Sequence, residues 1–403
     1  MNGARTVALA AFFTAVQFYT SLEALSPTPP AGYVFLGRAG AFALAGVLVV
    51  SAAVAAFSLR GARALHRTPL GAAYLLWIGA TLASALLGLD PNSGLQVVAT
   101  MAVAAAFGLA LVRAWNERGV APALLASYLS AGTLAAFAGI VMALTHRPAV
   151  LYASSYGRAA GFFATANQFA EFANLFTFTC AGLALGARSR AWRLAAIAGT
   201  ASGAVALAFT FSREGLFGAA AAALLLAIGS GRNALASLGV LGVVATAAVV
   251  ATLTFPHHDP SDAFSRLRTL DAGVRVAELF PLTGAGPVDF WRVYPAIRPV
   301  NGAPPGTFGA LHPHDLYVSL AGEVGLAGLC AIAWGAWRIG RALAMSLRGK
   351  PWRARAPALG VCAALVAVLV SGIFDTIGVV QLTFVWIPYA ALALALAEGG
   401  APV

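Results

Sequence analysis

Apolar residues along this chain are grouped into long continuous blocks, which short segments rich in arginine, glycine and proline separate. Residues 103–112 and 219–228, for example, contain no charged residue and are apolar on every side. Blocks of about 20 apolar residues have the length that an α-helix needs to cross the ~30 Å hydrocarbon core of a bilayer. A membrane β-barrel would instead alternate apolar and polar residues over about 10 positions. The pattern therefore predicts an all-α polytopic membrane protein.

The blocks predict about twelve membrane spans in one integral membrane domain, residues 1–403, and the first block is expected to be a retained span. A long polar interval, residues 256–311, separates the ninth span from the tenth, and no internal repeat is visible. The expected spans are residues 6–25, 39–58, 69–88, 94–112, 120–144, 161–186, 191–211, 215–230, 233–255, 314–337, 356–376 and 381–398.

Composition and charge fit this class. The chain is 60% hydrophobic and 10% charged, with a formal net charge of +11. Most basic residues lie in short segments beside alternate spans, which the positive-inside rule explains without nucleic acid as a partner. The same rule predicts cytoplasmic N- and C-termini. Cysteines 180, 330 and 362 all lie in apolar runs without metal-ligand spacing, so we expect no disulfide, metal or cofactor.

The basic residues that fall on the opposite, outer side of the predicted membrane are all arginine. Arginine binds phosphate and carboxylate groups through two hydrogen bonds at once, so these side chains are candidates for an anionic substrate. A genome that favours arginine codons would produce the same composition. The outer arginines are Arg38, Arg147, Arg158, Arg213, Arg266, Arg268, Arg275, Arg292 and Arg298.

The polar interval is expected to lie outside the membrane. Apolar residues spaced three or four apart, from Phe264 through Leu267 and Val274 to Phe280, predict a helix over 261–280 with an apolar underside on the membrane surface. Arg268 and Arg275 are spaced to pair with Asp271 on this helix. Residues 281–287 and 301–306 have the glycine and proline content of loops, which suits a mobile flap.

Histidines at the end of the interval are candidates for proton transfer. His312 and His314 flank a proline at the start of the tenth span, and Asp315 follows. A surface histidine can accept a proton from a hydroxyl near neutral pH, and a carboxylate stabilises the imidazolium that forms. Solvated loop histidines are the alternative. A metal site that adds residues 257–259 is less favoured, because no acidic cluster accompanies them.

Two other features place polar groups at the membrane boundary. Arg213 lies in a very short connection in which Ser212 is a candidate helix N-cap, so free N–H groups would adjoin the arginine in an anion site. A surface pair with Glu214 is the alternative. Asn167, Glu171 and Asn174 form a polar stripe on the sixth span, and Glu323 lies nine residues into the tenth. Such residues serve function or hydrogen bonds between helices.

Four segments together resemble the bacterial O-antigen ligase and polymerase superfamily of membrane glycosyltransferases. His314-Asp-Leu-Tyr-Val-Ser-Leu-Ala-Gly-Glu-Val-Gly is similar to the family's His-Asn signature at the start of a late span. Ser212-Arg-Glu-Gly is similar to its Ser-Arg turn. Arg266 followed by Phe280-Pro-Leu-Thr-Gly-Ala-Gly, and the stretch that begins with Arg158-Ala-Ala-Gly-Phe, are similar to two further segments. The resemblance covers residues 158–328, with Asp315 where the family usually has Asn and Ala166 where it has Pro.

The resemblance implies metal-independent, inverting transfer of a glycan from undecaprenyl pyrophosphate to a sugar hydroxyl on the periplasmic side of the bacterial inner membrane. It implies that His314 is the base, that Arg213 and Arg266 bind pyrophosphate, and that Arg158 and Asn167 lie near the donor. Lipid A core as acceptor would make the protein a ligase, and a second lipid-linked glycan would make it a polymerase. A transporter or flippase of lipid-linked glycans is the alternative from another class, and it should show related halves.

Overall fold

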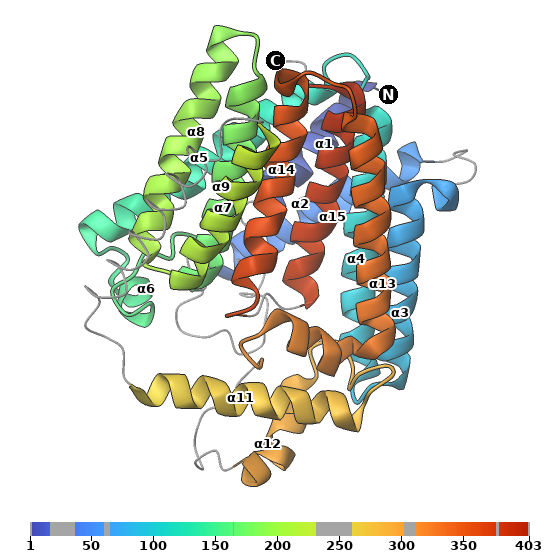
Figure 1. Cartoon of the computed structure of the whole chain (residues 1–403), viewed down its shortest axis with the longest axis vertical. Coiled ribbons are helices and arrows are strands. Elements are labelled where there is room, and N and C mark those ends of the chain that lie inside the picture. Colours follow the sequence, from blue (N-terminus) through green and yellow to red (C-terminus); the bar gives the residue numbers. More distant parts are fainter. Residues whose placement is uncertain are drawn as a thin grey trace.

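The computed structural model describes residues 2–16, 37–59, 65–163, 165–230, 260–301, 312–375 and 379–401. They form a bundle of helices with one helix lying across its end, and the described part contains no strand (Figure 1). The elements are α1 (Asn2–Val16), α2 (Gly37–Ser58), the 3-10 turn η2 (Leu65–Arg67), α3 (Pro69–Leu87), α4 (Pro91–Ala114), α5 (Val120–Thr145), α6 (Ala149–Ser154), α7 (Ala166–Gly186), α8 (Arg190–Thr210), α9 (Arg213–Gly229), α11 (Pro260–Leu279), α12 (Phe290–Asn301), α13 (Leu316–Leu347), α14 (Trp352–Ser371) and α15 (Val379–Gly399).

Seven of the described helices are long and apolar enough to cross a membrane, namely α3, α4, α5, α7, α8, α13 and α14. This agrees with an all-α polytopic membrane protein, whereas the predicted count of about twelve spans is not confirmed. Shorter apolar segments lie in α1, α2 and α15, and α9 has 17 residues. The predicted span over 233–255 lies outside the described residues.

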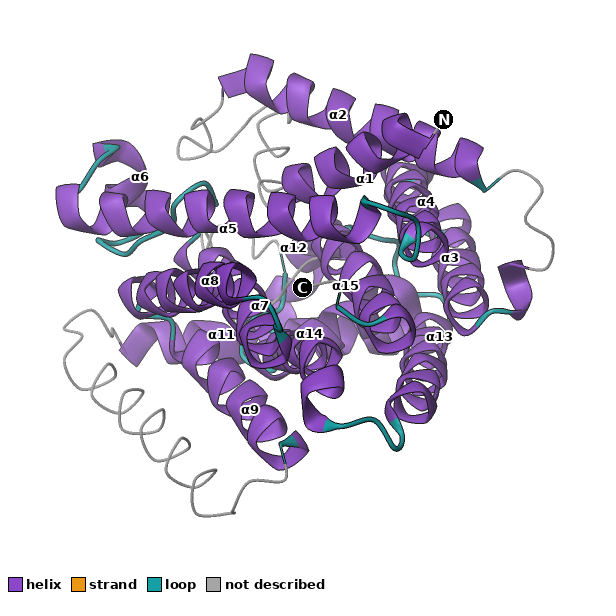
Figure 2. Cartoon of the chain, turned by 90° about the horizontal axis from the view of Figure 1, so that it is seen from above, coloured by secondary structure: helices purple, strands orange, loops and turns teal. Residues whose placement is uncertain are grey.

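Helix α7 lies at the centre of the bundle, where it packs most extensively against α8 and α14 (Figure 2). Small residues make this close packing possible. A Cβ atom added to Gly182 would lie 2.6 Å from the Cα atom of Gly360, so these two helices touch backbone to backbone. Polar side chains from the start of α7 and from the turn after α14 meet in the site described below.

Both chain ends lie at one end of the bundle, together with the connections after α4 and α13 (Figure 1). Arg5 pairs with Glu117, and Trp115 Nε1 donates to the carbonyl oxygen of Gly400 at 3.0 Å. Lys350 Nζ donates to the carbonyl oxygen of Ala397. Helices α11 and α12 lie at the opposite end, which we call the α11 end.

Helix α11 has nearly the predicted bounds, and its small-residue face packs against the rest of the chain. Leu267 and Val274, on the predicted membrane-facing underside, are 61% and 42% exposed, while Ala272 and Val276 are fully buried. Gly273 explains which face packs. A Cβ atom there would lie 2.6 Å from Pro313 and from Val318, so the small-residue face is the one that can approach α13. That contact holds the proline between His312 and His314.

Residues 281–289 form a loop, as predicted, and its backbone is hydrogen-bonded to α13. Helix α13 is interrupted at Gly325, where φ is 64° and ψ is −171°. The loop backbone supplies the hydrogen bonds that the break removes: Ala285 N donates to the carbonyl of Gly322 at 2.8 Å, and Leu326 N donates to that of Pro281 at 2.9 Å. The following helix, α12, was not anticipated. Residues 302–311, which include most of the second predicted loop, lie outside the described residues.

Candidate active site

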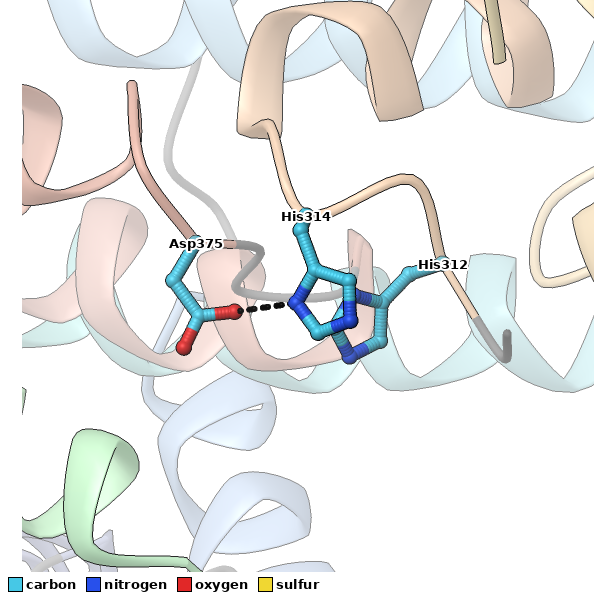
Figure 3. A group of neighbouring side chains, drawn as sticks. All are labelled: His312, His314 and Asp375. Atoms are coloured by element: carbon cyan, nitrogen blue, oxygen red, sulfur yellow. Dashed lines mark hydrogen bonds and ion pairs between the residues drawn. The ribbon is translucent and has the colours of Figure 1, made fainter. Parts of the chain in front are cut away.

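Two helix ends place His314 beside an acidic residue that is distant in sequence. The backbone N–H of Leu316, at the start of α13, donates to the carbonyl oxygen of Gly372, after α14, at 2.7 Å. This bond brings the segment before α13 next to the segment after α14. His314 Nδ1 and Asp375 Oδ1 are consequently 3.3 Å apart (Figure 3). His314 has a left-handed backbone, with φ of 56°, which turns its ring toward the carboxylate.

The charge of Asp375 fixes which imidazole nitrogen carries the proton. Burial favours the neutral form of this carboxyl group, but the hydrogen bond from His314 and the neighbouring imidazoles lower the pKa of Asp375 to about 2. An ionised carboxylate can only accept hydrogen bonds, so His314 Nδ1 is the donor. The other nitrogen of His314, Nε2, then has a free lone pair and can accept a proton.

Asn167, at the start of α7, connects this pair to an arginine. Its Nδ2 donates to Asp375 Oδ2 at 2.6 Å, and its Oδ1 accepts from Arg158 Nη2 at 2.6 Å. Arg158 is itself anchored, because its Nε donates to the carbonyl oxygen of Thr210 at 2.7 Å. Burial lowers the pKa of Arg158, and the nearby carboxylates of Glu214 and Asp375 counteract this. The result is a continuous chain of hydrogen bonds from Arg158 to His314.

We predict that Asn167→Leu slows a reaction that depends on His314 while leaving the protein folded. The substitution removes one hydrogen bond to an ionised carboxylate and one from a guanidinium, each worth about 1.5–3 kcal/mol. If one of these bonds is lost from the transition state, turnover should fall roughly 10- to 150-fold. The matched control is Gln168→Leu, because this neighbouring amide has a side-chain oxygen without a hydrogen-bond partner among the described residues. Equal activity of the two variants would contradict a positioning role for Asn167.

The two arginines expected to bind an anion lie close to this chain of hydrogen bonds. Arg266 Nη1, from α11, donates to the carbonyl oxygen of Phe374 at 3.3 Å, one residue before Asp375. Arg213 begins α9, and its charge and that of Arg266 both act on Arg158. Ser212 is the N-cap of α9, as predicted, since its Oγ accepts from Gly215 N at 3.2 Å. Guanidinium groups from three elements therefore gather at the α11 end.

The polar stripe on α7 divides into two parts. Asn167 lies in the site, whereas Asn174 is fully buried and its Nδ2 donates to the carbonyl oxygen of Gly215 at 2.8 Å. Asn174 therefore joins α7 to α9 by a hydrogen bond between helices, one of the two roles that the sequence analysis allowed for this stripe. Glu171 is 7% exposed and Glu214 is 8% exposed. Glu171 interacts electrostatically with Asp375, and Glu214 interacts electrostatically with Arg158.

The other predicted site residues make contacts that stabilise the local fold. Asp315 caps α13, with Oδ1 accepting from Val318 N at 2.8 Å, so the carboxylate beside the imidazole is Asp375. Arg275 pairs with Asp271 at 3.0 Å, as its spacing predicted. Glu323 is buried at the break in α13, and its backbone carbonyl accepts from Ser84 Oγ at 2.7 Å.

His312 lies against His314, with ring centroids 4.5 Å apart in an edge-to-face arrangement (Figure 3). Burial, and then the neighbouring His314, lower the pKa of His312 to about 4. Its Nδ1 is buried and has no hydrogen-bond partner among the described residues. His312, His314 and Asp375 each offer one atom that can bind a metal, and these three atoms lie within 4.8 Å of one another. The three side chains could therefore bind one metal ion. Residues 257–259, part of the less favoured metal hypothesis, lie outside the described residues.

Asp375 is the site residue that the sequence analysis missed. It was assigned to a span over 356–376, but α14 ends at Ser371, and residues 372–375 form a turn beyond the helix. The available indication was an acidic residue at the very end of an apolar block, since carboxylates are rarely placed inside a membrane. Its partnership with His314 depends on a contact across 61 residues of sequence, which no local pattern reveals.

Comparison with known proteins gives a match to a family model. Residues 173–333 match the family model described as O-antigen ligase. The match includes Arg213, Arg266, His312 and His314, and it ends before Asp375. A search of curated proteins gives no match.

Proposed function

We propose, because residues 173–333 match the family model described as O-antigen ligase, that this membrane protein transfers a glycan from undecaprenyl pyrophosphate to a hydroxyl group of an acceptor sugar. The observation that supports the proposal most strongly is the pairing of His314 with the ionised Asp375. It supplies a base beside clustered arginines at one end of an apolar bundle. A lipid-linked pyrophosphate substrate requires this combination of groups at the membrane boundary.

In the proposed reaction, His314 Nε2 removes the proton from the acceptor hydroxyl as its oxygen attacks the anomeric carbon of the donor. The bond from that carbon to the pyrophosphate oxygen breaks at the same time, and undecaprenyl pyrophosphate leaves with the bonding electron pair. The proton remains on His314 as an imidazolium, which the carboxylate of Asp375 stabilises. A single displacement of this kind inverts the configuration of the anomeric carbon.

We assign to Arg213 and Arg266 the stabilisation of the negative charge that develops on the leaving pyrophosphate. Guanidinium groups bind phosphate oxygens in pairs and remain charged throughout the pH range of proteins. Placed in advance near the leaving group, they stabilise the transition state without the reorganisation that water requires. The proposed mechanism therefore uses arginines in the role that a divalent metal ion has in many glycosyl transfers.

The proposed location is the bacterial inner membrane, with the α11 end facing the periplasm. The excess of arginine and lysine in the connections at the opposite end supports cytoplasmic termini. Lipid-linked glycans and membrane lipids would then reach the site from the bilayer, beneath α11. The acceptor would approach from the periplasmic side.

We assign the acceptor as lipid A core, which makes the protein a ligase. The test is transfer in liposomes that contain undecaprenyl-pyrophosphate glycan, with either lipid A core or a second lipid-linked glycan as acceptor, in the presence of EDTA. We expect one glycan to be joined to lipid A core. A ladder of products without lipid A would instead identify a polymerase, and movement of the donor across the bilayer without a new bond would identify a flippase.

The same assay tests the pyrophosphate assignment. Arg266→Gln should lower kcat/KM for the donor roughly 10- to 150-fold, the equivalent of one lost charged hydrogen bond of about 1.5–3 kcal/mol. Arg268→Gln is the matched control, because Arg268 lies on the exposed side of the same helix. An equal loss in both variants would contradict a specific role for Arg266.

A further inference from the structure

We propose that His312, His314 and Asp375 also form a binding site for Zn²⁺, and that the bound ion inhibits glycan transfer. One ligating atom from each residue lies within 4.8 Å of the others. The segment before α13 supplies both histidines, and the turn after α14 supplies the carboxylate (Figure 3). Two rigid helix ends therefore hold the three groups together before any ion binds.

The chemistry of the donors selects the kind of ion. Two imidazoles and one carboxylate are a ligand set that Zn²⁺ binds readily, and three protein ligands leave a fourth position for water. Mg²⁺ and Ca²⁺ prefer oxygen ligands and would be bound poorly here. Ligand distances of about 2.0–2.2 Å place tetrahedral ligand atoms roughly 3.5 Å apart, so groups within 4.8 Å of one another must move inward by about 1 Å to close around the ion.

A second, independent observation comes from His312. Its Nδ1 is buried without a hydrogen-bond partner in the described part of the chain. A buried polar atom that lacks a partner costs about 1–3 kcal/mol. A ring rotation or a small shift that brings this lone pair to a metal ion would satisfy it. Asn167 and Arg158, by contrast, have hydrogen bonds that already explain their positions.

The expected affinity is limited by the charge of the surroundings. Arg158 reaches Asp375 through Asn167, and Arg266 binds the carbonyl oxygen of the preceding residue. These cations oppose a further positive charge, so we expect reversible binding that a chelator removes. A permanently bound structural zinc ion would need a more negative environment.

The inhibitory consequence rests on the proposed function. A histidine that coordinates a metal ion has given up the lone pair with which it would accept a proton from the acceptor. The ion also draws Asp375 away from the Nδ1–H group that it orients. Bound Zn²⁺ would thus remove the base and its partner in one step.

Binding is tested without any activity assay, with Co²⁺ as a spectroscopic probe for the zinc site. The purified full chain should bind one Co²⁺ with the visible absorption of a four- or five-coordinate site, and added Zn²⁺ should displace it. His312→Ala and Asp375→Ala should each lose this absorption, while His146→Ala and the double variant His257→Ala/His258→Ala should keep it. Thermal unfolding of each variant checks that the fold is retained. Absence of the absorption in the wild-type chain, or its persistence in His312→Ala, would overturn the site.

Inhibition is tested separately in the transfer assay. Added Zn²⁺ should stop transfer, and excess EDTA should restore it. Transfer that continues at Zn²⁺ concentrations that saturate Co²⁺ displacement would overturn the inhibitory role. Absence of transfer under all conditions would contradict the proposed function, whereas the result of the Co²⁺ titration would still decide whether the metal site exists.

Discussion

Replacing His314 with asparagine is expected to lower the turnover of glycan transfer by about 10²–10⁴-fold, the usual contribution of a positioned general base. Asparagine tolerates the left-handed backbone that His314 adopts, so the substitution removes the base without straining the chain. Asp375→Asn should cause a loss of similar size, because it removes the charge that stabilises the imidazolium and that holds the proton on Nδ1. Turnover is measured with saturating donor and acceptor.

The matched control for this prediction is His146→Asn. His146 also has a positive φ, of 55°, but its ring stacks on Tyr152 and lies outside the site. The control variant should transfer glycan at the wild-type rate. Unchanged turnover in His314→Asn, or an equal loss in His146→Asn, would contradict the assignment of His314 as the base.

Gly284→Ala is expected to destabilise the protein severely. Gly284 has a φ of 74°, and an added Cβ atom would lie 2.2 Å from the backbone carbonyl carbon of Glu323. The left-handed backbone costs roughly 1–2 kcal/mol for alanine, and overpacking adds about 1–3 kcal/mol. Because the clash is with backbone, no side chain can rotate to relieve it. We expect loss of the loop from the break in α13, a lower temperature of unfolding and little recovered protein.

The control is Gly340→Ala, a substitution on α13, the helix whose break the loop fills. An added Cβ atom at Gly340 has no neighbour within 4 Å, and alanine favours the helix. This variant should unfold at the wild-type temperature or slightly above it. If Gly284→Ala unfolded at the same temperature as Gly340→Ala, the insertion of residues 281–286 into the break of α13 would be wrong.

Local patterns in the sequence predicted the features that depend on residues near one another in the chain, such as helix bounds and helix caps. The bounds of α11 follow from apolar spacing, and the cap at Ser212 follows from a hydroxyl residue just before an apolar run. The face of α11 that packs against the rest of the chain could not be predicted in this way. Hydrophobicity indicated Leu267 and Val274 as the membrane-facing side, but gave no sign that the close approach at Gly273 would bury Ala272 and Val276.

Long-range contacts explain what the sequence analysis did not find in the site. His314 was selected from its motif, while Asp315 was the only carboxylate that sequence proximity offered it. The structure uses Asp315 to cap α13 and brings Asp375 to the imidazole from the end of another helix. The position of residues 281–286 was missed for the same reason, since they bind to a break in α13 that has no local indication except a glycine.

The configuration of the anomeric carbon in the product is the most direct test of the account. A donor with a defined glycosidic phosphate linkage is reacted with the acceptor by the purified protein, and the new linkage is determined by NMR. A single displacement by a hydroxyl that His314 activates predicts an inverted linkage together with release of undecaprenyl pyrophosphate. Retention of configuration, or consumption of donor without a new glycosidic bond, would contradict it.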